Sequence, residues 1–122
     1  MIDLGQFENR WLHGGFVVRT IELTDSRIED PLGREATAQT QVVASEFRLL
    51  LRSGLSDEEL SVTLYHEILE AACVAVADPP VALIDFNEAD FERAARKSHA
   101  RWGNASLMNL NLMLQFYGFR GQ

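Results

Sequence analysis

The feature that most constrains this chain is a long apolar segment with ionisable residues at its centre. A helix is expected from Asp57 to about Ala77, because Ser56 begins an S-x-x-E capping box and a Pro-Pro pair at 79–80 prevents continuation. At about 100° per residue, the apolar side chains of this segment point in nearly every direction. That pattern predicts a helix that is buried on most sides.

Three residues in the middle of this helix, His66, Glu67 and Glu70, do not belong to an apolar core. A buried ionised carboxylate costs several kcal/mol unless it is paired, protonated or bound to a metal. His66 and Glu70 lie four residues apart, about 40° around the helix, so both can reach one point in space. The spacing is that of the H-E-x-x-H motif with Glu70 at the second histidine, and in that motif the i, i+4 pair holds zinc while the intervening glutamate acts as general base.

The stretch from FRLLLRSGLS through DEELSVTLYHEILEAA resembles the core of small zincin-like metalloproteases, in which a strand and a short turn lead into the H-E-x-x-H helix. The resemblance covers roughly residues 16–77. It implies a zincin-like fold in which His66 is the first metal ligand and Glu67 is the catalytic base. Glu70 stands where that family usually has its second histidine, and a carboxylate there favours harder ions relative to zinc.

A third metal ligand has to come from outside this helix. The next predicted helix carries Glu88, Glu92 and His99 along one edge, within about 40° of one another. Neutral imidazole is the commonest metal donor, so His99 is the expected third ligand. Glu88 and Glu92 are the alternatives, because gluzincin-type relatives take their third ligand from a glutamate on a later helix.

The function predicted from these residues is that of a metal-dependent hydrolase, and most specifically a peptidase. Zinc or another divalent ion would be held by His66, Glu70 and His99, with Glu67 taking the proton of an activated water. The alternative is a zincin-fold structural or protein-interaction domain without turnover, with or without a metal. A third interpretation needs no metal, since His66 and Glu70 could form a buried hydrogen-bonded pair and Glu67 a salt bridge to Arg48 or Arg52.

The rest of the sequence predicts one α+β domain over residues 1–122. An N-terminal helix (Ile2–His13) is expected to precede a small three-stranded sheet. The expected strands span residues 16–23, 37–43 and 47–52, and two C-terminal helices are expected after the Asp57–Ala77 helix. The first of these would run from a cap at Asp85 or Asn87 to Trp102, and the second from Leu107 to Phe116. Strands and helices in separate runs favour this class over an alternating parallel sheet.

Composition narrows the set of partners. The net charge of −7 argues against binding to nucleic acid or to an anionic membrane surface, both of which require a basic footprint. The apolar stretch between Leu60 and Ile84 is interrupted by charges and prolines, so no membrane span is expected. One cysteine, Cys73, requires no oxidising compartment, and the N-terminus lacks the pattern of a secretory signal. A cytoplasmic protein with a peptide or protein substrate is therefore expected.

Overall fold

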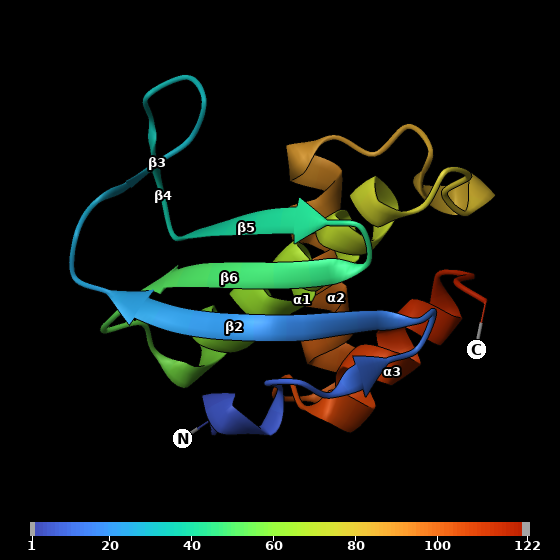
Figure 1. The fold of residues 1–122 in the computed structure, drawn as a ribbon, viewed down its shortest axis with the longest axis horizontal. Coiled ribbons are helices and arrows are strands. Elements are labelled where there is room, and N and C mark those ends of the chain that lie inside the picture. Colours follow the sequence, from blue (N-terminus) through green and yellow to red (C-terminus); the bar gives the residue numbers. More distant parts are fainter. Residues whose placement is uncertain (1, 121–122) are drawn as a thin grey trace.

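A computed structural model of the chain describes residues 2–120. The fold is α+β, and three helices lie behind one face of a sheet (Figure 1). These helices are α1 (Asp57–Ala75), α2 (Glu88–Trp102) and α3 (Leu107–Phe116), each within two or three residues of its predicted bounds. Local capping explains this agreement, because Ser56, Asn87 and Ser106 each accept a hydrogen bond from a backbone amide in the first turn of their helix.

The main sheet has four strands in the order β1-β2-β6-β5. The long central strands β2 (Phe16–Thr24) and β6 (Glu46–Arg52) run parallel to each other. The short strand β1 (Trp11–Leu12) pairs antiparallel with β2, and β5 (Ala38–Val43) pairs antiparallel with β6 as the opposite edge. The strand predicted over residues 37–43 is thus confirmed, and it lies at an edge of the main sheet.

The expected three-stranded sheet is wrong, and with it the zincin-like architecture built on that sheet. The main sheet has four strands and mixed direction, and a second sheet of two strands is formed by β3 (Ile28–Glu29) and β4 (Glu35–Ala36). The β3–β4 hairpin lies between the strands predicted over residues 16–23 and 37–43, where no strand was expected. It projects beyond the β5 edge of the main sheet in Figure 1.

The predicted N-terminal helix over Ile2–His13 is also wrong. One short 3-10 helix, η1 (Leu4–Gln6), is followed by strand β1. Gly14 and Gly15, which follow the predicted helix, have positive φ values of 99° and 85° and form the turn between β1 and β2. Pairing with β2 satisfies the backbone of this segment better than an isolated short helix could.

The core lies between the main sheet and the helices. Phe47, Leu49 and Leu51 alternate along β6 and are at most 2% exposed, as the period of a strand requires. Tyr65, Ile68 and Leu69 of α1 are equally buried on the other side of the interface. Within residues 2–120, no helix is both long enough and apolar enough to cross a bilayer.

Candidate metal centre

Helices α1 and α2 pack side by side and antiparallel, and their contact forms the floor of the candidate site. Because the directions are opposed, early residues of α2 meet the middle of α1. Glu88 and Glu92, one turn apart on α2, therefore lie against His66 of α1. The Asn87 capping box with Asp90 fixes where α2 begins and hence where these two carboxylates stand.

Both ring nitrogens of His66 are engaged by carboxylates. Nδ1 lies 2.9 Å from Oε1 of Glu92, and Nε2 lies 3.1 Å from Oε2 of Glu88. The other oxygen of Glu92 accepts from Arg96, with Nη2 at 2.9 Å. The side chain of His66 is only 12% exposed, so its ring is held in one orientation by the packing and by Glu92.

Glu70 completes the group around Nε2 of His66. Its Oε2 lies 4.0 Å from that nitrogen, as the i, i+4 spacing predicted. Glu88 also interacts with Glu70, through its charge and through a side-chain hydrogen bond. Burial, the hydrogen bond with Glu88 and the charge of Glu88 together raise the pKa of Glu70 to about 8. The pKa of Glu88 is lowered, mainly by the same hydrogen bond, because Glu88 is the accepting partner.

Glu67 points from α1 toward the sheet. Its Oε1 accepts a hydrogen bond of 2.7 Å from the hydroxyl of Thr40 on the edge strand β5. Burial raises the pKa of Glu67, and the Thr40 hydrogen bond acts in the opposite direction. No salt bridge of Glu67 to Arg48 or Arg52 forms within the described residues, and Arg52 pairs instead with Glu35.

His66, Glu67 and Glu70 can each offer one ligand atom such that all three atoms lie within 4.8 Å of one another. Imidazole nitrogen and carboxylate oxygen are donors that zinc, manganese and iron accept. A ligating histidine usually donates its second ring N–H to a carboxylate, which fixes the tautomer. Glu92 lies where its carboxylate can accept such a hydrogen bond from Nδ1 of His66.

The structure does not bring His99 to this cluster. Its Nδ1 lies 2.8 Å from the hydroxyl of Ser61, and that hydroxyl accepts in turn from the amide of Ala105. His99 therefore belongs to a chain of hydrogen bonds that links α2, α1 and the segment between α2 and α3. The alternatives Glu88 and Glu92 occupy the position beside His66 that His99 was expected to take.

A cavity of about 1080 Å³ opens over the cluster. Its walls come from the β3–β4 hairpin, the edge strand β5, helices α1 and α2, and the segment that joins the two helices. Cys73 also lines the cavity. Burial and, secondarily, the charge of Glu70 raise the pKa of the Cys73 thiol to about 11.

Two parts of this site were missed by reasoning from the sequence. Thr40 entered the sequence analysis only as part of the predicted strand over residues 37–43, and no local signal ties it to Glu67. No strand was predicted for the β3–β4 hairpin, although the alternation of Ile28 with charged neighbours is a weak strand signal.

No protein-family model, no curated protein and no solved structure matches this chain.

Proposed function

We propose that this chain is a divalent-metal-dependent hydrolase that acts on polypeptides, with His66, Glu70 and Glu88 as metal ligands and Glu67 as general base. The observation that carries the proposal is the arrangement around His66. Its Nδ1 is held by Glu92, while its Nε2 faces the carboxylates of Glu70 and Glu88. One nitrogen is thus bordered by two carboxylates, with oxygens of Glu70 and Glu88 at 4.0 Å and 3.1 Å from it, and these are donors that a divalent ion accepts.

The donor set fits a divalent ion. Burial and the neighbouring Glu88 raise the pKa of Glu70 to about 8, so at neutral pH Glu70 keeps a proton that avoids repulsion between two ionised carboxylates. A cation in place of that proton would remove the repulsion and satisfy both oxygens. The set holds one imidazole and several carboxylates, so manganese or iron fits it as well as zinc. An ion bound here would polarise a substrate carbonyl and lower the pKa of a water molecule.

Glu67 is suited to accept a proton. Its raised pKa brings it closer to neutrality, where a general base works most effectively. Thr40 donates to one oxygen of Glu67 and fixes the rotamer, so the other oxygen can accept a proton and pass it to a leaving amine. Thr40 thus acts as a positioning residue through Glu67.

The polypeptide substrate is inferred from the edge strand. Strand β5 has β6 on one side and no strand on the other within the described sheet, and Thr40 of β5 contacts the proposed base. An extended segment can add to such an edge through main-chain hydrogen bonds, which would lay it beside Glu67. The chain has one cysteine and so needs no oxidising compartment, which favours a cytoplasmic location for this activity.

The direct test is peptide hydrolysis by protein purified without chelator. Wild type with its metal should cleave members of a peptide library, and Glu67→Gln should keep the metal but lose cleavage. Glu22→Gln, an exposed substitution on β2, is the matched control and should cleave as wild type does. Cleavage by Glu67→Gln at the wild-type rate would refute the assignment of the base.

A second candidate function is metal binding without turnover. Glu70 favours it, because a carboxylate replaces the second histidine of the H-E-x-x-H motif and makes the ion a weaker Lewis acid. In that case wild type would hold a stoichiometric metal and cleave no member of the library.

A further inference from the structure

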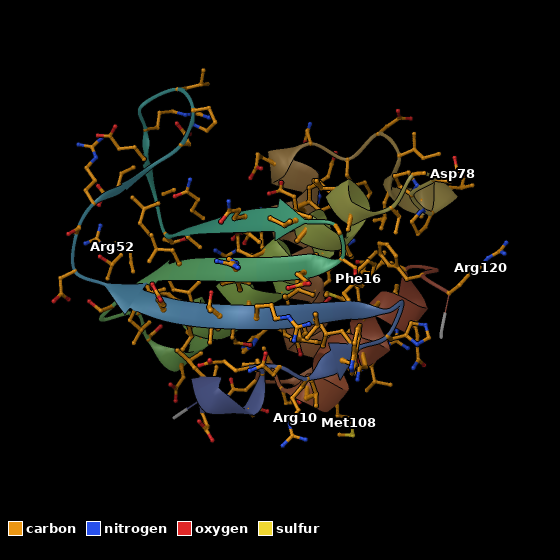
Figure 2. All side chains as sticks on the ribbon, in the orientation of Figure 1. Arg10, Phe16, Arg52, Asp78, Met108 and Arg120 are labelled. Atoms are coloured by element: carbon orange, nitrogen blue, oxygen red, sulfur yellow. The ribbon has the colours of Figure 1, made fainter. Side chains whose placement is uncertain are left out.

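Helix α3 exposes a row of apolar side chains on the side that faces away from the core. Met108, Leu112 and Phe116 follow one another at intervals of four residues and are 69%, 37% and 55% exposed. Side chains at this spacing lie in one row along a helix, so the three form a continuous surface. The helix carries no charged residue. Figure 2 shows Met108 at the lower margin of the molecule, on the opposite side from the β3–β4 hairpin.

A row of basic side chains on α2 runs into this apolar row. Arg93, Lys97 and Arg101 are also spaced by four residues, and all three are exposed. The guanidinium of Arg101 lies over the ring of Phe116, 4.9 Å from its centroid, and 5.3 Å from the centroid of Trp102. This contact joins the two rows into one surface. We call the surface formed by Lys97, Arg101, Trp102, Met108, Leu112 and Phe116 the α2–α3 strip.

The α2–α3 strip belongs to the basic part of an acidic chain. All 18 Asp and Glu residues lie at or before Glu92. The basic residues that follow are Arg93, Arg96, Lys97, Arg101 and Arg120. The first two of these are paired with carboxylates of their own helix. Lys97 and Arg101 form no ion pair with any other residue that the structure describes. A partner that covers the strip therefore meets unpaired positive charge beside apolar side chains.

We propose that the α2–α3 strip binds an acidic amphipathic helix of another protein. The apolar row of that helix would lie along Met108, Leu112 and Phe116, and its carboxylates would face Lys97 and Arg101. Rows of side chains four residues apart pack into the matching grooves of a facing helix. Charges of opposite sign beside such a row select the partner and its orientation.

Two other occupants fit the strip less well. Nucleic acid requires a larger basic footprint than Lys97 and Arg101 provide, and the net charge of −7 repels it. A second copy that met the strip face to face would bring the same two cations of each chain toward each other. An acidic helix matches both the charge of the strip and its apolar row.

The strip is separate from the candidate metal centre. Helix α3 contacts β1, at the opposite edge of the main sheet from β5, and none of the residues of the strip lines the cavity over His66. Binding at the strip therefore does not depend on the proposed function, and removal of metal with EDTA should leave it unchanged.

The test compares three designed peptides of about 20 residues, long enough to form a helix in water. The first carries a row of leucines flanked by glutamates, the second replaces the leucines with serine, and the third replaces the glutamates with lysine. Each is labelled with fluorescein, titrated with wild type and followed by anisotropy. The Glu-Leu peptide should bind at least about tenfold more tightly than either of the others, because each of them lacks one half of the match. Equal affinities for the three peptides would overturn the proposal.

Two variants locate the binding. Phe116→Ser should reduce the affinity for the Glu-Leu peptide several-fold. Lys97→Glu should reduce it too and should raise the affinity for the Lys-Leu peptide, which damage to the fold would not do. Leu32→Ser and Arg27→Glu are the matched controls, because both residues are exposed in or beside the β3–β4 hairpin, beyond the β5 edge in Figure 1. Equal losses in the controls, or no loss in the two strip variants, would overturn the assignment.

Two further measurements test the other occupants. Wild type and Phe116→Ser should have the same mass in sedimentation equilibrium, and a wild-type dimer that Phe116→Ser dissociates would overturn the proposal in favour of a second copy. Fluorescein-labelled oligothymidylate should bind wild type more weakly than the Glu-Leu peptide does. Tighter binding of the oligothymidylate would overturn the proposal in favour of nucleic acid.

Discussion

Glu92 holds Nδ1 of His66 at 2.9 Å from the neighbouring helix, which leaves Nε2 as the nitrogen that faces Glu70 and Glu88. This contact sets both the orientation and the tautomer of the imidazole. It also makes α2 part of the site, because a shift of α2 along α1 would move Glu92 and Glu88 together.

The first prediction concerns this contact. Glu92→Gln should weaken binding of a divalent ion about 10- to 100-fold, as loss of a carboxylate partner of a ligating histidine usually does. The amide still fits beside Nδ1, so the fold should be unchanged by circular dichroism. Isothermal titration calorimetry with zinc and with manganese measures the affinity, and Glu22→Gln serves as the control. Unchanged affinity in Glu92→Gln would show that the His66–Glu92 contact is only structural.

A second prediction separates Glu88 from His99. Glu88→Ala should weaken metal binding by at least about tenfold, because it removes an oxygen facing Nε2 of His66. His99→Ala should leave the metal affinity nearly unchanged but lower the free energy of unfolding by about 1 kcal/mol, through loss of the hydrogen bond to Ser61. Calorimetry and urea unfolding of both variants measure the two effects. The reverse pattern would restore His99 as the ligand.

The pH dependence of metal binding is the third prediction. The pKa of Glu70 is raised to about 8, so below that pH a proton competes with the ion for Glu70. The contribution of Glu70 should therefore make affinity rise with pH up to about 8 and level off above it. Glu70→Gln should bind more weakly and with a shallower pH dependence. An affinity that is independent of pH between about 6 and 8 in wild type would contradict a competing proton at Glu70.

Without metal, the raised pKa of Glu70 makes the free energy of unfolding fall as the pH rises, whereas metal affinity rises with pH. The folded chain binds this proton more strongly than the unfolded chain does, so the neutral form of Glu70 stabilises the fold. This contribution is fully present below the ordinary pKa of a glutamate and is lost as the pH rises through about 8. Urea unfolding in EDTA should show this loss of stability in wild type and a smaller one in Glu70→Gln.

The reactivity of Cys73 is the fourth prediction. Its pKa is raised to about 11, so at neutral pH almost none of it is the reactive thiolate. Iodoacetamide should therefore modify Cys73 in the folded chain more slowly than in the chain unfolded in urea. At about pH 9, where Glu70 is ionised, Glu70→Gln should speed the reaction, since the charge of Glu70 contributes to the raised pKa of Cys73. Mass spectrometry over time measures both rates, and faster labelling of the folded chain would contradict the raised pKa.

The sequence predicted the parts of this structure that depend on local interactions. The caps at Ser56, Asn87 and Ser106 define the starts of the three helices, and the i, i+4 geometry of one helix joins His66 to Glu70. The N-terminal segment was mispredicted as a helix because its structure depends on pairing with β2, and the local sequence carries no information about that partner.

The choice of the third ligand failed for the same reason, because it depends on how two helices pack and not on local sequence. Reasoning from the sequence placed Glu88, Glu92 and His99 on one edge of a helix and turned that edge toward His66. The position along the helix axis remained open, and His99 lies seven residues beyond Glu92, about 10 Å farther along. The antiparallel packing of α1 and α2 sets this position, so His99 meets Ser61 while Glu92 meets His66.

The central claim, that His66 and its carboxylates hold a divalent ion, is tested most directly by elemental analysis of protein purified without chelator. Wild type should contain close to one equivalent of a divalent transition metal per chain. His66→Ala should contain almost none, while His99→Ala should retain the wild-type amount. Absence of a stoichiometric metal in wild type, together with failure to take up zinc, manganese or iron on addition, would contradict the account.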